Sequence, residues 1–222
     1  MSFETLGLAP ALLRALAENN YTTPTPIQEQ AIPLILAGHD VLGGAQTGTG
    51  KTAAFALPVL NRLSKVTPPA GPRKPRTLVL VPTRELAVQV ADSFKTYGRH
   101  LKLNVTTLFG GVGMQPQVEQ LRRGVDVLVA CPGRLIDHLD RGSVKLDAIE
   151  VLILDDLLIS PLTREEQREL LEIVEERYDR KATIITSQLP VKAWHDAMQD
   201  PTLADAILDR LVHNAYKLEL KG

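Results

Sequence analysis

The sequence predicts an α/β fold in which helices cover both faces of a mainly parallel β-sheet, giving a three-layer αβα arrangement. Short runs that are apolar on both faces alternate along the chain with segments of helical spacing, which is typical of parallel sheets. The 222 residues are 44% hydrophobic and 23% charged. That composition and length are ordinary for a globular protein with one substantial core.

Taken in chain order, the predicted elements follow from these runs. Six apolar runs are expected to form strands, at residues 40–45, 76–82, 104–109, 125–130, 151–156 and 182–187. Helical spacing recurs between them, over residues 84–97, 115–123 and 132–140. Residues 67–76 are rich in proline, which indicates a surface loop.

Two further helices have marked starts. Thr163 and Glu166 form the T-x-x-E pattern of a capping box ahead of one helix. Asp200 before Pro201 combines a good N-cap with a proline at the first helical position. The second helix is expected to run from about 201 to 213, with a buried stripe of Leu203, Ile207, Leu208 and Leu211.

Charge and cysteine content limit the classes of function. The formal net charge is −1, so any contact with nucleic acid needs a local basic patch. Cys131 is the only cysteine, which excludes an internal disulfide and suits a reducing compartment. The start of the chain does not resemble a signal peptide, and no apolar run approaches the roughly 20 residues of a membrane span. We expect a cytoplasmic protein without membrane contact.

The stretch AQTGTGKT, residues 45–52, follows one predicted strand and opens a helix. It fits the phosphate-binding pattern G-x-x-x-x-G-K-[ST], with Ala45 at the first glycine. Gly48 and Gly50 allow the backbone to wrap a phosphate, and the helix N-terminus adds positive charge. Lys51 is expected to reach the β- and γ-phosphates and Thr52 to ligate Mg²⁺. A Gly/Thr-rich turn without function is the alternative, and the strand–loop–helix context disfavours it.

Asp155 follows a later strand, where a carboxylate on the metal side of such a site is expected. Alone, an aspartate after a strand is more often a loop residue or a cap. Together with the phosphate loop, Asp155 is the candidate second metal ligand. Asp156 is then the candidate that orients or deprotonates the attacking water.

Residues 1 to about 154 resemble the first RecA-like domain of a DEAD-box RNA helicase, close to the RhlE-like branch. The resemblance rests on YTTPTPIQ (21–28), AQTGTGKT, PTRELA (82–87), GG (110–111) and CPGR (131–134), in family order. It implies a RecA-like P-loop NTPase that uses ATP and Mg²⁺ and contacts the RNA backbone. The implied nucleotide-binding residues are Phe3, Gln28, Ala45, Gln46, Thr47, Gly48, Thr49, Gly50, Lys51 and Thr52. The implied RNA-contacting residues are Pro82, Thr83, Arg84, Gly110, Gly111, Pro132, Gly133 and Arg134.

From Asp155 onward the sequence departs from that family, which continues with Glu-Ala-Asp where this chain has Asp156, Leu157 and Leu158. Residues 155–222 resemble the C-terminal part of IstB-like transposition helper ATPases of the DnaC type. That resemblance makes Asp155-Asp156 a native strand ending and places Thr186–Gln188, with the nucleotide-binding candidate Gln188, where those ATPases carry sensor 1. It also places Arg210 at a position used as an arginine finger toward a neighbouring subunit. The apparent junction near residue 155 could arise from a natural fusion, an engineered chimera or a misassembled reading frame, and the sequence does not separate these origins.

Both families place the sensor strand between the phosphate-loop strand and the strand before Asp155. The two parts, 1–154 and 155–222, are therefore expected to complete one sheet, as a single P-loop NTPase domain over residues 1–222. Arg210 is more often a salt-bridged residue than a finger, and Trp194 more often core packing than a nucleic-acid contact. His195 could also face nucleic acid.

We expect ATP binding with slow hydrolysis, because Asp156 is one methylene shorter than the family's glutamate. Leu158 lacks the carboxylate that the family uses to link this turn to the sensor strand, and we expect no second RecA-like domain within residues 1–222. Unwinding by this polypeptide alone is therefore not expected. Three functions stay open: a nucleic-acid-associated ATPase, a non-catalytic ATP/RNA-binding module, and a DNA transposition helper ATPase. DNA binding and the oligomeric state are left open too.

Overall fold

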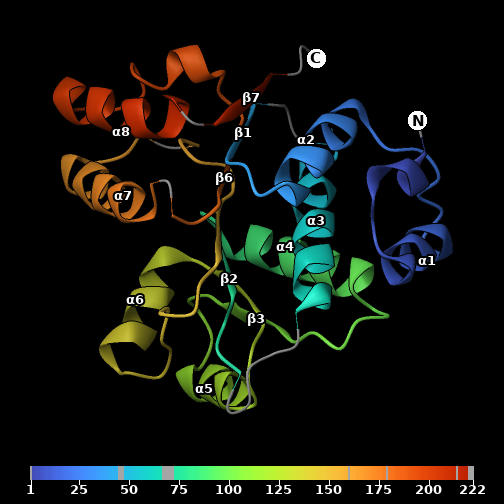
Figure 1. The fold of residues 1–222 in the computed structure, drawn as a ribbon. Helices are drawn as coiled ribbons and strands as arrows, with labels where there is room; N and C mark the ends of the chain where they lie inside the picture. Colours follow the sequence, from blue (N-terminus) through green and yellow to red (C-terminus); the bar gives the residue numbers. More distant parts are fainter. Residues whose placement is uncertain are drawn as a thin grey trace.

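The computed structural model of the chain describes residues 2–44, 48–66, 73–159, 161–178, 180–213 and 215–219. In these residues one sheet of seven strands forms the centre of the molecule, in the order β3-β4-β2-β5-β6-β1-β7 (Figure 1). Every pairing is parallel. The strands are β1 (Val41–Gly44), β2 (Thr77–Leu80), β3 (Val105–Leu108), β4 (Val127–Ala130), β5 (Val151–Leu154), β6 (Thr183–Ser187) and β7 (Tyr216–Glu219).

Helices connect the strands and cover both faces of the sheet. They are α1 (Pro10–Glu18), α2 (Pro26–Leu36), α3 (Lys51–Lys65), α4 (Arg84–Tyr97), α5 (Met114–Arg122), α6 (Pro132–Asp140), α7 (Arg164–Arg177) and α8 (Pro201–His213). Two 3₁₀ turns, η1 (Phe3–Leu6) and η2 (Val191–Ala193), complete the set. The α/β three-layer prediction with a parallel sheet is confirmed.

Successive side chains along each strand point to opposite faces of the sheet and so contribute to two separate hydrophobic cores. Val79 and Ile153 belong to the core beneath α2, α3 and α4, whereas their neighbours Leu78 and Leu152 belong to the core beneath α6, α7 and α8. Figure 1 shows these two helical layers on opposite sides of the strands. Because both faces are buried, the strands are apolar throughout, as the sequence indicated.

Strand β6 lies between β5 and β1, as predicted for the sensor strand. Ile184 is in register with Val41 on one side and Ile153 on the other. The start of β6 is held by a 2.6 Å hydrogen bond from the Thr183 amide to the Asp40 carboxylate. Segments on both sides of residue 154 therefore contribute strands to the same sheet.

The local predictions for the elements are confirmed to within one or two residues. Thr163 and Glu166 form the predicted box, because the Thr163 amide donates to Glu166 Oε2 at 2.8 Å and the Glu166 amide donates to Thr163 Oγ1 at 3.3 Å. Asp200 Oδ1 accepts from the Leu203 amide at 3.1 Å and so caps α8. Of the predicted stripe, Ile207 and Leu211 are buried and the other two leucines are half-buried. Residues 67–72 of the proline-rich loop lie outside the described residues.

Candidate functional site

The described part of the turn between β1 and α3 has backbone angles that suit a phosphate loop. Gly48 and Gly50 have φ angles of +82° and +91°, values that side chains with a Cβ rarely adopt. A Cβ on Gly50 would lie 2.4 Å from Gln28 Nε2, so this position also lacks the space for one. Gly48 is exposed, Thr49 and Thr52 are half-buried, and Thr52 is the second residue of α3. The predicted residues Ala45, Gln46 and Thr47 lie outside the described residues.

Lys51, the first residue of α3, meets the end of β5. Its Nζ lies 3.1 Å from Asp156 Oδ1, and the two side chains are only 9% and 7% exposed. This contact joins positions 105 residues apart in sequence. The structure therefore brings together the predicted phosphate-binding cation and the predicted catalytic carboxylate.

Asp155 lies beside this pair and is bound to strand β6. Thr186 Oγ1 donates to Asp155 Oδ1 at 2.5 Å and accepts from the Asp156 amide at 2.9 Å. Burial of the Asp155 carboxyl raises its pKa to about 6, with the neighbouring Asp156 charge acting in the same direction; the Thr186 hydroxyl and the Lys51 charge oppose the rise. The sequence placed Thr186 in the sensor segment 186–188, but its hydrogen bonds to Asp155 and Asp156 were not predicted.

Asp156 occupies a tight turn that presents both of its carboxylate oxygens. Its φ angle is +55°, in the left-handed region that aspartate tolerates better than most residues. Oδ1 faces Lys51 and Oδ2 accepts from Gln188 Nε2 at 3.1 Å. The predicted residue Gln188 is exposed and lies directly after β6. The carboxylate is thus held on one oxygen by the Lys51 ammonium and on the other by the neutral amide of Gln188.

Leu158 makes no side-chain hydrogen bond because it carries no polar atoms, and it is buried with a φ angle of +63°. Other groups make the connection between this turn and β6. Ser187 Oγ donates to the Leu157 carbonyl at 2.7 Å, and the Leu157 amide donates to the Thr186 carbonyl at 2.9 Å. The turn after β5 is therefore fixed to β6 through backbone groups and hydroxyls.

Gln28 spans two elements with its amide. Nε2 donates to the Gly50 carbonyl at 3.1 Å, and Oε1 accepts from the Thr25 amide at 2.9 Å. Each amide atom keeps a further donor or acceptor position for a ligand. Phe3 is 5% exposed and packs within the core on the α2 and α3 side of the sheet, so its predicted contact with a base stays a prediction.

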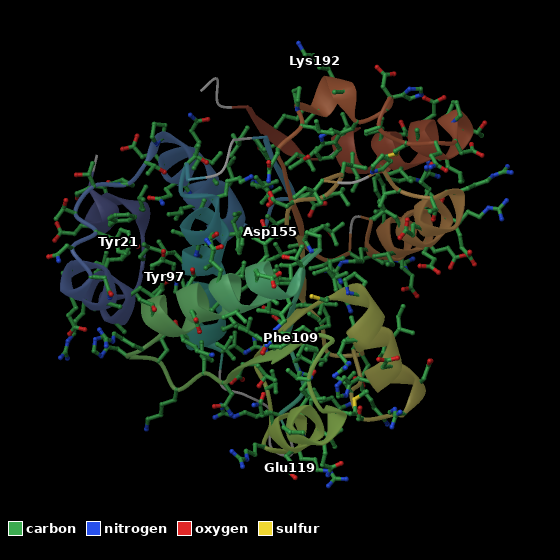
Figure 2. All side chains as sticks on the ribbon, turned by 180° about the vertical axis from the view of Figure 1, so that it is seen from behind. Tyr21, Tyr97, Phe109, Glu119, Asp155 and Lys192 are labelled. Carbon is green, nitrogen blue, oxygen red and sulfur yellow. The ribbon has the colours of Figure 1, made fainter. Side chains whose placement is uncertain are left out.

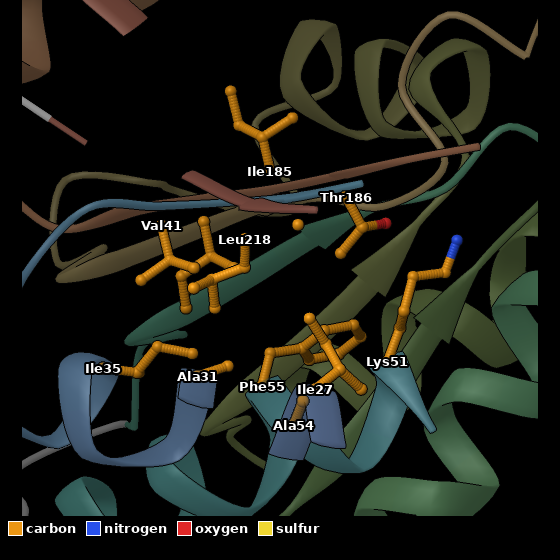
Figure 3. A pocket seen from close by; sticks show the side chains of 12 residues that line it. Ile27, Ala31, Ile35, Val41, Lys51, Ala54, Phe55, Ile185, Thr186 and Leu218 are labelled. Atoms are coloured by element: carbon orange, nitrogen blue, oxygen red, sulfur yellow. The ribbon is translucent and has the colours of Figure 1, made fainter. Parts of the chain in front are cut away.

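A small apolar cavity of about 20 Å³ lies beneath the phosphate loop, between α2, α3 and strands β1, β6 and β7 (Figure 3). Lys51 and Thr186 mark its polar end, and side chains such as Ile27, Phe55 and Leu218 line the rest. The volume is close to that of one water probe, so it cannot hold a nucleotide. A nucleotide would have to bind at the loop edge above it.

The three predicted RNA-contacting segments lie against one another. Arg84, the first residue of α4, places its Cζ 5.0 Å from the centre of the Phe109 ring. A Cβ on Gly111 would lie 3.4 Å from Arg84 Nη1. Arg134 Nη1 donates to the Val112 carbonyl at 3.1 Å. The remaining predicted residues, Pro82, Thr83, Gly110, Pro132 and Gly133, are all exposed.

Arg210 lies on α8 and pairs with Glu175 of α7 at 3.1 Å and with Asp209 at 3.5 Å. These contacts fit the salt-bridged alternative, and an arginine-finger role in an oligomer stays a prediction. Trp194 is fully buried, and its Nε1 donates to the Leu189 carbonyl at 3.0 Å. Trp194 is therefore a core residue.

The residues present fit a nucleotide-bound Mg²⁺ better than a metal held by protein alone. Among the described residues no group of three or more His, Cys, Asp or Glu side chains could hold a metal ion. Mg²⁺ usually takes one or two protein oxygens and completes its shell with phosphates and water. The Asp155 carboxylate and the Thr52 hydroxyl supply the oxygen ligands that Mg²⁺ prefers. Gly48 and Gly50 carry no side chain that would keep a phosphate away from the backbone of the loop.

A profile of the DEAD/DEAH box helicase family matches residues 25–187. The chain belongs to this family. The match extends across Asp155, Asp156 and strand β6, beyond the point where the sequence interpretation saw the resemblance end. This match does not show the expected resemblance of residues 155–222 to IstB-like ATPases.

Among curated proteins, the chain is 47% identical over 156 residues to the ATP-dependent RNA helicase DeaD of Mycobacterium tuberculosis (strain CDC 1551 / Oshkosh), covering 70% of this chain and 27% of the relative. It is 46% identical over 156 residues to DeaD of Escherichia coli (strain K12), covering 70% of this chain and 24% of the relative. The chain thus spans about a quarter of the length of these DEAD-box relatives.

Two solved structures share the fold over nearly the whole chain. A hypothetical ATP-dependent RNA helicase from Sulfolobus tokodaii superposes with a TM-score of 0.75 at 28% identity, over 95% of this chain and 56% of that one. A DEAD box protein from Methanococcus jannaschii superposes with a TM-score of 0.76 at 26% identity, over 100% of this chain and 56% of that one. The RecA-like arrangement of a DEAD-box helicase therefore includes the last strands and helices.

No helix within the described part of the chain has the length and apolar character needed to cross a membrane.

Proposed function

We propose that this chain binds ATP with Mg²⁺, hydrolyses it slowly and contacts the RNA backbone, as the N-terminal RecA-like domain of a DEAD-box helicase. The observation that carries the proposal is the buried 3.1 Å contact between Lys51 and Asp156. A buried ammonium needs an anionic partner. In the absence of a phosphate, Asp156 is that partner.

The roles of the residues follow from this contact. Lys51 exchanges Asp156 for the β- and γ-phosphates when ATP binds, and Gln188 still holds Asp156 Oδ2. Asp156 then orients or deprotonates the attacking water. Thr52 and Asp155 hold Mg²⁺, which when bound neutralises charge on the phosphates. Gln28 contacts the adenine with its free donor and acceptor positions.

Slow turnover follows from the length of Asp156. Its carboxylate is one methylene nearer the backbone than the glutamate of the family, and a misplacement of about 1 Å costs about 100-fold in rate. Leu158 supplies no carboxylate to link the turn to β6. We therefore propose that the 222-residue polypeptide does not separate strands on its own, and that it acts as a single domain in the cytoplasm.

ATP hydrolysis with and without single-stranded RNA tests the proposal. We expect weak activity that Lys51→Ala abolishes, while Lys65→Ala, an exposed lysine at the end of the same helix, leaves it intact. Asp156→Glu is expected to raise the rate if the geometry follows the DEAD-box pattern. Robust RNA-stimulated turnover by the monomer would contradict slow hydrolysis. RNA binding that persists in Lys51→Ala without any turnover in the parent would favour a non-catalytic binding module.

A second candidate comes from residues 155–222, which we propose derive from an IstB-like ATPase. Its support is the Asp155-Asp156 pair, together with the 156-residue extent of the identity to DeaD, which covers 70% of the chain. A transposition helper would assemble on duplex DNA with Arg210 as a finger in trans. Size-exclusion chromatography with ATP and duplex DNA separates the candidates, because large assemblies sensitive to Arg210→Ala are expected only from the helper.

A further inference from the structure

An aromatic side chain outside the predicted motifs holds one of the RNA-facing cations. The Arg84 guanidinium lies over the Phe109 ring with Cζ 5.0 Å from the ring centre. Arg84 is exposed, and no carboxylate among the described residues pairs with it; Phe109 is half-buried, directly after β3, and packs against the core on the α4 side. Figure 2 labels Phe109 near the middle of the view, below the label of Asp155.

The turn that carries Phe109 is fixed on both sides. The buried side chain of Gln117, on α5, donates from Nε2 to the Phe109 carbonyl at 3.1 Å. Arg134, from α6, donates to the Val112 carbonyl at 3.1 Å. Gly111, with a φ angle of +76°, lies beside Arg84, because a Cβ at this position would be 3.4 Å from Arg84 Nη1. The ring is thus held in place before any ligand arrives.

We propose that Phe109 is a positioning residue for RNA, acting through Arg84. The guanidinium lies over the π-face of the Phe109 ring, a contact that needs no hydrogen-bond acceptor, whereas contacts with phosphate use the N–H groups of the guanidinium. Stacking therefore fixes the direction of a long side chain without consuming its donors. An arginine held in this way loses less conformational freedom when it forks onto a backbone phosphate. This inference rests on the proposed RNA contact and adds the residue that prepares it.

Fluorescence anisotropy with a labelled oligouridylate, in the presence of Mg²⁺ and a non-hydrolysable ATP analogue, tests the inference. Phe109→Leu is expected to weaken binding about 2- to 5-fold, the range of one exposed cation–π contact, while the slope of log affinity against log salt stays unchanged because no charge is lost. Phe109→Tyr keeps a ring and is expected to restore wild-type affinity. Arg84→Ala is expected to weaken binding more and to reduce the salt slope by about one.

The double variant Phe109→Leu with Arg84→Ala decides the mechanism. If Phe109 acts through Arg84, the leucine substitution has no further effect in the alanine background. An equal loss in both backgrounds would overturn the inference, since the ring would then contact RNA itself or support the fold. Wild-type affinity of Phe109→Leu would overturn it as well. If wild-type protein does not bind RNA, the proposed function fails instead. Thermal melting identifies a folding defect, and Phe109→Met then replaces the leucine variant.

Discussion

Replacing the buried carboxyl of Asp155 by an amide is expected to stabilise the ligand-free protein while removing its response to Mg²⁺ and ATP. Asp155 is 7% exposed, and the pKa of its carboxyl is raised to about 6 from an ordinary 3.8, chiefly by burial. Between these two values the folded state binds a proton more tightly than the unfolded state. The free energy of unfolding therefore falls as pH rises through this window, and the penalty is complete above about pH 6.

The size of the penalty follows from the two pKa values of Asp155. Each pKa unit corresponds to about 1.4 kcal/mol, so the destabilisation at neutral pH is about 3 kcal/mol. In Asp155→Asn, Oδ1 still accepts from the Thr186 hydroxyl, but the new NH₂ group needs a partner, which offsets part of the gain. We expect a net stabilisation of about 1 to 3 kcal/mol, or a rise in Tm of about 3 to 10 °C for a domain of this size.

Thermal melting in EDTA from pH 4.5 to 7.5 measures this effect. The variant is expected to melt higher than wild type at pH 7.5, and the difference is expected to shrink toward pH 4.5. Asp140→Asn, which changes an exposed aspartate at the end of α6, is the matched control and should follow wild type. Adding Mg²⁺ and ATP is expected to stabilise wild type but not Asp155→Asn. A variant that melts at or below wild type at pH 7.5, with a parallel pH profile, would refute the reasoning.

Three further substitutions test the packing around the site. Gly50→Ala is expected to lower both Tm and affinity for a fluorescent ATP analogue, because its Cβ would lie 2.4 Å from Gln28 Nε2 at a φ angle of +91°; unchanged affinity would count against the loop geometry. Trp194→Phe is expected to cost about 1 to 3 kcal/mol in urea unfolding, since the buried ring fills the core and its Nε1 bonds the Leu189 carbonyl; a cost near zero would show a loose core there. Thr163→Ala is expected to cost about 1 kcal/mol through the lost cap of α7, with ATP affinity unaffected, and a change in affinity would mean that α7 influences the site.

Local chemistry explains why much of the fold could be predicted from the sequence. The central strands can be recognised in the sequence as apolar runs. The caps at Thr163 and Asp200 can be recognised because each involves residues no more than three positions apart. Strand β7 was missed because Tyr216, Lys217, Leu218 and Glu219 alternate in polarity, unlike the central strands, and a short edge strand needs burial on one face only. Pairing of β7 with β1 supplies the stability that its own sequence does not signal.

In the candidate site too, features encoded in a contiguous stretch of sequence were predicted, whereas contacts between distant segments were not. Gly48, Gly50 and Lys51 were identified because the phosphate-loop pattern is contiguous in sequence. The partners of Asp155 and Asp156 were not, because hydrogen bonds from Thr186 and the contact with Lys51 join segments separated by 31 and 105 residues. The Arg84–Phe109 contact escaped prediction for the same reason. Distances of this kind depend on strand order, which spacing along the chain does not specify.

The change from Glu-Ala-Asp to Asp156-Leu157-Leu158 alters how the turn after β5 communicates with β6, rather than whether it does. Thr186 bonds both the Asp155 carboxylate and the Asp156 amide, and Gln188 bonds the Asp156 carboxylate. Asp156 thus contacts both the phosphate-loop lysine and Gln188 at the end of β6. If a phosphate replaces it on Lys51, Asp156 Oδ1 loses its cationic partner while Oδ2 keeps its bond from Gln188 and the backbone links remain. A nucleotide-dependent signal in this chain would therefore pass through the Asp156 side chain, and Leu158 contributes only apolar packing to it.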